Sequence, residues 1–396
     1  MANLRFGLRE CKARFILERM NSPTPTSWLE IDLNAIQNNY MELCRISGTK
    51  VAAVVKANAY GHGLIRVSQA VLDAGGEWLA VARFEEAEQL RKNWIMAPIL
   101  VLGFTPPDRV VEAAKENIRL TVFDAQTAHH YSTQTSERGM RVKVHIKINT
   151  GMNRLGISPQ EGVEFTRWLS NLPGIEVEGV FTHFARADEP ALDTTERQIR
   201  IFEEVLDSLK AAGVKPPIVH ASNSAAVFNY PKAAYDMVRC GIALYGLHPS
   251  PETPLPATFK PALSLKTRLT SIRELDAGEG VGYNYRYYTT NKERIGTIAV
   301  GYADGFRRVM GNKALLRGKE IPVVGSVCMD QCMVSLEGIQ DAQVGDEVVL
   351  IGKSGGLWRT TEDVAKEWGT VNYEVVCGMA DRLMRKYIYT NNRNDG

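Results

Sequence analysis

Short apolar runs alternate with amphipathic stretches over the first two-thirds of the chain. Eight such runs, rich in β-branched residues, are VAAVV (51–55), EWLAVA (77–82), PILVLG (98–103), IRLTVF (118–123), RVKVHIKI (141–148), IEVEGVF (175–181), PIVH (217–220) and YDMVR (235–239). The segments between them, such as 83–94 and 193–213, place apolar residues three and four apart, the spacing of a helix with one buried face. This alternation predicts βα units around a parallel sheet, and eight strands are the number that closes a (β/α)8 TIM-type barrel.

An open, doubly wound sheet is the alternative arrangement of the same units. A dinucleotide-binding version of it would carry a glycine-rich GxGxxG turn after the first strand. No such turn follows residues 51–55. The barrel is therefore the favoured prediction.

The pattern changes after residue 260 to alternating strands and glycine-containing turns. Examples are KTRLTSIREL, RIGTIAVGYADG, IPVVGSVCMD and VGDEVVLIG, which are typical of a β-rich domain. The proline-rich stretch 249–261 separates the two patterns. We expect an N-terminal extension and linker at 1–27, the barrel at 28–259 and a C-terminal β domain at 260–390.

Composition excludes several classes of function. The chain of 396 residues carries 47 Lys and Arg against 45 Asp and Glu, without a long basic run, so nucleic acid is not an expected partner. Its six cysteines are scattered with no CxxC pair, which indicates neither a metal site nor a disulfide framework. No apolar run reaches the roughly 18 residues of a membrane span. We expect a cytoplasmic protein with no metal and no membrane partner.

Polar residues directly follow several of the apolar runs. Reactive residues of a (β/α)8 barrel gather at these C-terminal strand ends. Lys56 closes the first run, and a partly desolvated lysine has a lowered pKa that suits its amine to Schiff-base formation. On position alone, a strand-end lysine that keeps its ammonium in water at the barrel rim is the commoner case.

The string AVVKANAYGHG around Lys56 changes that balance. It is one of ten separated strings, with TSWLEIDLNAIQNN, KINTGMNRLG, FTHFARADE, HASNSAA, VRCGIALYG, EGVGYN, GYADG, GSVCMDQCM and TVNYEVVC. In these strings and their order the chain resembles the alanine racemases from about Trp28 to Tyr387. The resemblance implies a pyridoxal-phosphate-dependent isomerase that interconverts L- and D-alanine as a homodimer, supplying D-alanine for peptidoglycan.

The resemblance also implies two catalytic bases. Lys56 would carry the cofactor and deprotonate D-alanine, and Tyr283 of EGVGYN, supplied by the partner subunit, would deprotonate L-alanine. A racemase moves protons on both faces of Cα, so two bases are needed. A phenol needs nearby positive charge or hydrogen bonds to act as a base at neutral pH.

Further matched positions would hold the cofactor. Arg239 would face the pyridine nitrogen, and a guanidinium only donates, so that nitrogen would stay unprotonated and the cofactor would be a weaker electron sink. The other implied cofactor-binding residues are Tyr60, Arg154, His183, His220, Asn223, Ser224, Gly241, Ile242 and Tyr373. Among these, Ser224, the backbone at Gly241 and Ile242, and Tyr373 match the phosphate site.

The implied substrate pocket combines both subunits. Arg154 would bind the substrate carboxylate, and Tyr302 and Met329 of the neighbouring subunit would narrow the pocket around a methyl side chain. Lys147 matches a lysine that can carry a carbamate, and Asn149 stands where many members have Asp. A serine or broad-specificity racemase remains an alternative, because one pocket residue changes side-chain selection by only about 1–3 kcal/mol.

Overall fold

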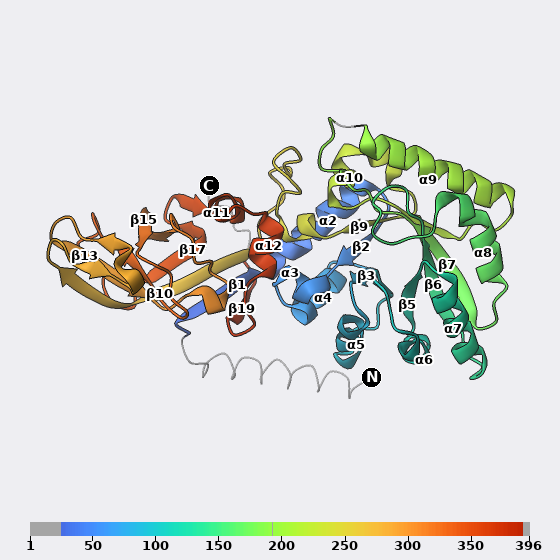
Figure 1. Cartoon of the computed structure of the whole chain (residues 1–396), viewed down its shortest axis with the longest axis horizontal. Coiled ribbons are helices and arrows are strands. Elements are labelled where there is room, and N and C mark those ends of the chain that lie inside the picture. The colour runs from blue at the N-terminus through green and yellow to red at the C-terminus, as the bar shows by residue number, and fades with distance from the viewer. Residues whose placement is uncertain (1–24, 192, 391–396) are drawn as a thin grey trace, which may run out of the picture.

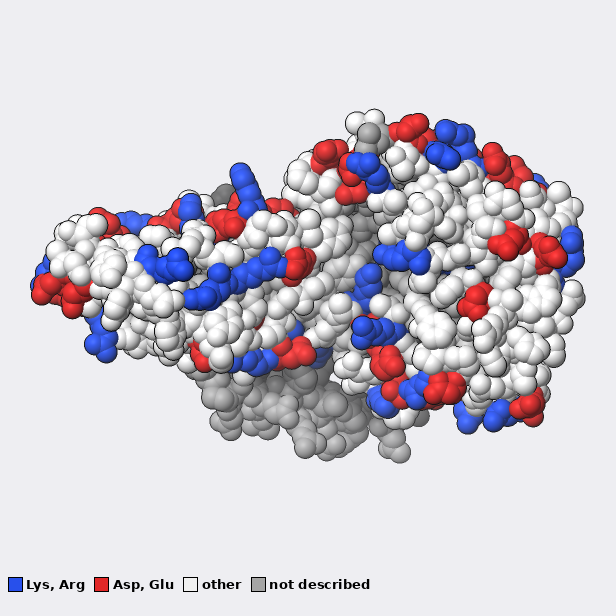
Figure 2. All heavy atoms as spheres, viewed as in Figure 1, with Lys and Arg blue, Asp and Glu red and all other residues white. Residues whose placement is uncertain are grey.

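The computed structural model describes residues 25–191 and 193–390 and shows two lobes, one rounded and one elongated (Figure 1). Most of the expected N-terminal extension, residues 1–24, lies outside the described residues. Basic and acidic side chains are interspersed over the face of both lobes seen in Figure 2, without one continuous basic patch. No helix in residues 25–191 and 193–390 has the length and apolar character of a membrane span.

The rounded lobe is a closed barrel of parallel strands in chain order. Its strands are β2 (Lys50–Val54), β3 (Trp78–Val81), β4 (Ile99–Val101), β5 (Ile118–Val122), β6 (Val142–Lys147), β7 (Ile175–Phe181), β8 (Ile218–His220) and β9 (Met237–Cys240). The last strand pairs with the first, which leaves no free sheet edge. All eight apolar runs form these strands, so the predicted barrel is confirmed and the open sheet is wrong.

Helices cover the outside of the barrel. The main ones are α2 (Leu33–Ser47), α4 (Leu64–Asp73), α5 (Phe84–Lys92), α7 (Ala125–Ser136), α8 (Gly162–Ser170) and α9 (Thr194–Ala211). Helix α9 buries residues three and four apart, among them Ile199, Phe202 and Leu209. It ends before Gly213, whose φ of +68° provides the left-handed turn that stops a helix.

The elongated lobe is built on one large sheet. Its strand order is β18-β17-β14-β15-β16-β13-β10-β1-β19. The strands are β1 (Ser27–Asp32), β10 (Leu263–Leu275), β13 (Glu293–Ile298), β14 (Lys313–Leu316), β15 (Lys319–Val324), β16 (Cys332–Ser335), β17 (Glu347–Ser354), β18 (Leu357–Arg359) and β19 (Met384–Ile388). Two helices, α11 (Thr361–Trp368) and α12 (Asn372–Cys377), join this lobe to the barrel mouth. The β-rich second domain is therefore present as predicted.

Strand β1 belongs to the second sheet, although its residues lie at the start of the range that we expected for the barrel. We placed the start of the barrel at residue 28, but Trp28 and Leu29 pair with β10 on one side and β19 on the other. Asp32 then ends the strand, and its side chain accepts hydrogen bonds from the backbone of Asn34 at 2.9 Å and Ala35 at 3.2 Å, capping α2. The chain enters the barrel lobe at this residue. Alternating polarity shows which face of a strand is buried but not which sheet receives it.

Candidate active site

A cavity of about 590 Å³ opens at the C-terminal ends of the barrel strands. It brings together eleven residues singled out from the sequence: Lys56, Tyr60, Lys147, Arg154, His183, Asn223, Ser224, Arg239, Gly241, Ile242 and Tyr373. Eight strands and α12 converge on this mouth, which is where the barrel architecture places its chemistry. His220 lies directly beneath and bonds to Arg239.

Lys56 is held on a turn with an unusual backbone. The N–H of Ala57 donates to Glu86 of α5 at 2.6 Å, while the same carboxylate accepts from Ala82 at 2.9 Å. Residues 57–60 then all adopt left-handed backbone with φ of 52–53°, a conformation that costs about 1–2 kcal/mol per non-glycine residue. A side chain at Gly61 would overlap the backbone of Val376, so α12 packs directly on this turn. Packing from both lobes therefore fixes the position of Lys56.

Positive charge dominates the cavity. Lys56, Lys147, Arg154 and Arg239 all line it. Burial, and next the charge of Arg154, lower the pKa of Lys56 and bring the pKa of Lys147 to about 8. Neither lysine forms an ion pair with any residue in the described part of the chain. The cavity thus fits a ligand that carries several negative charges.

One corner of the cavity suits a phosphate group. The hydroxyl of Ser224 accepts from the N–H of Gly241 at 3.0 Å, which brings the ends of β8 and β9 together. A side chain at Gly241 would overlap the hydroxyl of Tyr60, so glycine keeps this corner open. The rings of Tyr60 and Tyr373 lie 6.3 Å apart and close the other side. Asn223 has a structural part here, because its side chain accepts from Ala226 at 3.0 Å and caps the following helix.

Arg239 is held in one orientation under the cavity. Its Nη1 donates to Nδ1 of His220 at 2.9 Å, and its Nη2 donates to the carbonyl oxygens of Thr182 and Ala221 at 2.8 Å. Nη2 also lies 3.0 Å from Nδ1 of His183. Burial, followed by the charge of Arg239, lowers the pKa of His183 and of His220 well below the ordinary value, so both rings are neutral. The guanidinium therefore presents a fixed donor group.

Asn149 organises its own loop instead of contacting Arg154. Its side-chain oxygen accepts from the backbone of Gly151 at 3.2 Å and of Asn153 at 2.9 Å. Arg154 follows on the exposed part of this loop and reaches the cavity from there. Lys147 has its ammonium 5.5 Å from the centre of the Phe181 ring.

Tyr283, Tyr302 and Met329 lie on the second domain, and none of them lines the cavity of the same chain. Their side chains are 69%, 44% and 53% exposed. Hydrogen bonds join their loops, since the N–H of Tyr302 donates to the carbonyl of Cys328 at 3.0 Å and the Ser326 hydroxyl donates to the carbonyl of Tyr283 at 3.4 Å. The structure thus gathers the proposed cofactor residues in one chain and leaves these three on a separate surface.

Several residues of the mouth were not found from the sequence. Glu86 stands three residues after Arg83, a spacing that signals a helix cap, but its contact with Ala57 depends on tertiary structure. Cys377 of α12 also lines the cavity, and only its position at the end of TVNYEVVC pointed toward it. The left-handed turn at 57–60 has no signal in its sequence, because three of its four residues are not glycine or asparagine.

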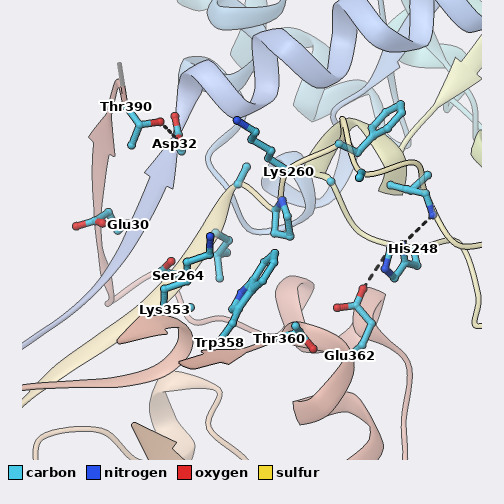
Figure 3. A pocket seen from close by; sticks show the side chains of 18 of the residues that line it. Glu30, Asp32, His248, Lys260, Ser264, Lys353, Trp358, Thr360, Glu362 and Thr390 are labelled. Carbon is cyan, nitrogen blue, oxygen red and sulfur yellow. Dashed lines mark hydrogen bonds between the residues drawn. The ribbon is translucent and has the colours of Figure 1, made fainter. Parts of the chain in front are cut away.

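A larger cavity of about 1040 Å³ lies at the seam between the lobes (Figure 3). Its charged groups already have partners: Lys266 pairs with Glu30 at 3.0 Å, and Glu362 accepts from Asn372 at 2.8 Å. None of the sequence-predicted site residues lines it. We therefore assign the chemistry to the barrel mouth.

A parallel barrel with a buried lysine at its mouth, followed by a β-rich domain, defines a class of two-domain barrel proteins with an anion-binding site. Models of the alanine racemase N-terminal domain and C-terminal domain match residues 31–249 and 262–387. The chain therefore belongs to the alanine racemase family, as its ten sequence strings indicated.

Known relatives match this chain over more than nine-tenths of its length. The alanine racemase of Symbiobacterium thermophilum is 45% identical over 364 residues, which are 91% of this chain and 97% of that protein. The alanine racemase of Halothermothrix orenii is 42% identical over 93% of this chain and 98% of its own length. Among solved structures, that of Clostridium difficile alanine racemase has a TM-score of 0.89 at 39% identity, covering 93% and 97% of the two chains. The Bacillus anthracis alanine racemase with bound L-Ala-P has a TM-score of 0.86 at 39% identity, covering 94% and 97%.

Proposed function

We propose that this protein is an alanine racemase that binds pyridoxal phosphate at the barrel mouth and interconverts L- and D-alanine. The observation that carries the proposal is the convergence of Lys56, Lys147, Arg154 and Arg239 on one cavity beside an open, hydroxyl-lined corner. Four cations fit a phosphate, a phenolate and a substrate carboxylate. Membership of the alanine racemase family supports the same reading.

The residues present would hold the cofactor at three points. Lys56 would supply the amine that attaches it, the corner at Ser224 and Gly241 would receive the phosphate, and Arg239 would face the ring nitrogen; all four residues line the cavity. When bound, pyridoxal phosphate supplies an electrophilic carbon and a conjugated ring that draws electron density from the Cα–H bond of the substrate. Arg154 binds the substrate carboxylate.

Two side chains move the α-proton. The lowered pKa of Lys56 increases the share of neutral amine that can accept a proton on one face of Cα. The partner subunit's Tyr283 serves the opposite face. Tyr283 is exposed and does not line the cavity of its own chain, which supports a role in the site of a neighbouring subunit. The same holds for Tyr302 and Met329. We accordingly propose a homodimer with shared sites, whose product D-alanine serves peptidoglycan.

Lys147 has a second proposed role. A carbamate forms when a neutral amine attacks carbon dioxide and releases a proton, and a pKa of about 8 makes that neutral form accessible. The resulting anion would form an ion pair with Arg154 and fix its orientation. Asn149 carries no charge and therefore could not take this role. This proposal gives the buried lysine a function in the cavity.

Racemisation of alanine and serine tests the proposed function. Wild type should invert both enantiomers of alanine, and Lys56→Ala should lose the absorbance band of the lysine-bound cofactor together with activity. Lys50→Ala is the matched control, because Lys50 is an exposed lysine at the opposite end of the same strand. The ratio of serine to alanine turnover decides between an alanine racemase and a broad-specificity one. A wild type that binds the cofactor but inverts neither amino acid would overturn the proposal.

A further inference from the structure

A chain of polar side chains continues from Arg239 into the interior of the barrel. Nε2 of His220 and Nδ1 of His145 lie 2.8 Å apart, and Nε2 of His145 lies 3.2 Å from a carboxylate oxygen of Glu178. Both histidines are fully buried, on β8 and β6, and Glu178 lies on β7. The lumen of this barrel thus carries a hydrogen-bonded chain that begins under the cavity and leads away from it.

Two cations hold the far end of this chain. Arg119 places Nε 3.0 Å and Nη2 3.2 Å from the two oxygens of Glu178, and Lys143 donates to the same carboxylate at 3.0 Å. Burial alone would raise the pKa of Glu178, but hydrogen bonds from His145 and Arg119 outweigh it and lower that pKa, so the carboxylate is ionised. An ionised carboxylate only accepts hydrogen bonds.

The two ends fix the proton positions in between. The guanidinium of Arg239 only donates, so Nδ1 of His220 must be an unprotonated acceptor and its proton is on Nε2. That proton is donated to Nδ1 of His145, whose own proton is therefore on Nε2 and is donated to Glu178. Burial lowers the pKa of both rings; the charge of Arg239 adds to this effect at His220, and Glu178 opposes it at His145 without reversing it, in keeping with neutral imidazoles. Every bond of the chain then points from Arg239 toward Glu178.

Reversing the chain would create a conflict at Arg239. If His145 and His220 carried their protons on Nδ1, two N–H groups would face each other between His220 and Arg239. The guanidinium would have to leave the position that its other nitrogen holds against Thr182 and Ala221. Metal-binding histidines are oriented by carboxylates in the same manner, and loss of such partners typically costs about 10- to 100-fold in affinity or activity.

We propose that His145 and Glu178 are positioning residues that fix the tautomer of His220 and, through it, the donor group that Arg239 presents to the cofactor. The proposal rests on the proposed function for the identity of that ligand. The hydrogen-bond chain itself is complete in the protein without it, so it can be tested on the cofactor-free protein.

Nitrogen-15 NMR of histidine-labelled protein measures the tautomers directly. The chain has seven histidines, few enough to assign by single substitutions. In the wild-type apoprotein, His145 and His220 should both show the neutral Nε2–H pattern. A doubly protonated or Nδ1–H form of His220 in the wild type would overturn the proposal, and this result needs no variant to fold.

Glu178→Gln tests the anchoring carboxylate. Its amide oxygen should face Arg119 and Lys143, which turns the NH₂ group toward His145 and should produce Nδ1–H forms of both rings. Glu176→Gln is the matched control, because Glu176 lies on the same strand, half-exposed and 3.7 Å from Lys143. Wild-type tautomers in Glu178→Gln would contradict the inference.

A pair of variants at His145 separates positioning from filling space. The amide of His145→Gln can accept from His220 and donate to Glu178, whereas His145→Leu can do neither. With cofactor bound, His145→Leu should lower kcat about 10- to 100-fold with little change in KM, and His145→Gln should recover most of it. Equal kcat in the two variants would overturn the proposal. Failure of the proposed function would instead appear as a wild type that does not racemise.

Discussion

Lys147 shows how the charge of the cavity acts on a single residue. It is 5% exposed, and burial together with Arg154 and Arg239 brings its pKa from 10.5 to about 8. Between these two pH values the unfolded lysine binds a proton that the folded one releases, so stability rises with pH. Below pH 8 both states are protonated, and the buried charge destabilises the fold.

Removing this charge should therefore stabilise the apoprotein. Lys147→Met in bicarbonate-free buffer should raise the free energy of unfolding at pH 7 by up to about 3 kcal/mol, and the gain should fade toward pH 10.5. Urea unfolding at both ends of this range measures it, with the exposed Lys50→Met as control. A Lys147→Met protein no more stable than wild type at pH 7 would show that the buried charge of Lys147 does not destabilise the fold.

Gly241 supports a prediction about cofactor affinity. A methyl group there would overlap the Tyr60 hydroxyl and lie 3.0 Å from its ring carbon Cζ, so the phosphate corner must narrow. Gly241→Ala should weaken pyridoxal phosphate binding about tenfold or more, measured by spectroscopic titration. Tyr60→Phe in the same protein should restore part of the affinity by removing the overlapping oxygen. Gly356→Ala is the control, since a side chain there meets nothing within 4 Å, and an equal loss in both would refute the argument.

At the scale of secondary structure, Asp32 links the two lobes. It ends β1 in the large sheet and caps α2 of the barrel lobe through two backbone N–H groups. Asp32→Ala should lower the free energy of unfolding by about 0.5–2 kcal/mol, because both N–H groups lose their acceptor. Asp32→Asn keeps an acceptor oxygen and should stay close to wild type in the same denaturation experiment. Equal destabilisation by the two substitutions would mean that charge, not capping, is what matters.

The elements differ in how far their sequences determine them. The barrel strands were readable because both faces are buried, which gives uninterrupted apolar runs such as 51–55, and the polar residue that ends each run marks the mouth. The ten strings shared with the alanine racemases identified Lys56 and Arg239 as site residues before the structure placed them in the cavity. The assignment of β1 to the second sheet could not be read, because strand pairing is set by distant segments. The chain from His145 to Glu178 was missed for a related reason: each residue sits inside an apolar run, where sequence pattern predicts core packing.

At the scale of the whole molecule, the proposed shared site makes one subunit depend on another. Lys56→Ala and Tyr283→Phe proteins should each be inactive as homodimers. Mixed and allowed to exchange subunits, they should recover roughly a quarter of wild-type activity, since half of the dimers are mixed and each mixed dimer has one intact site of two. Activity after mixing and size by light scattering measure the outcome.

Two results would contradict this prediction. Absence of recovered activity, when native mass spectrometry shows that mixed dimers have formed, would place both bases in one chain. A fully active monomer would exclude the shared site altogether. Mixing Lys56→Ala with itself is the control for exchange conditions.

The place of β1 between β10 and β19 also bears on synthesis. The strand leaves the ribosome before any of the barrel, yet both of its neighbours are encoded later, the second of them at the end of the described chain. While the barrel folds, residues 27–32 therefore have no strand to pair with. Unpaired segments of this kind are prone to associate with other nascent chains. Completion of the second sheet thus depends on β19, and a chain that ended before Met384 would leave one edge of β1 unpaired.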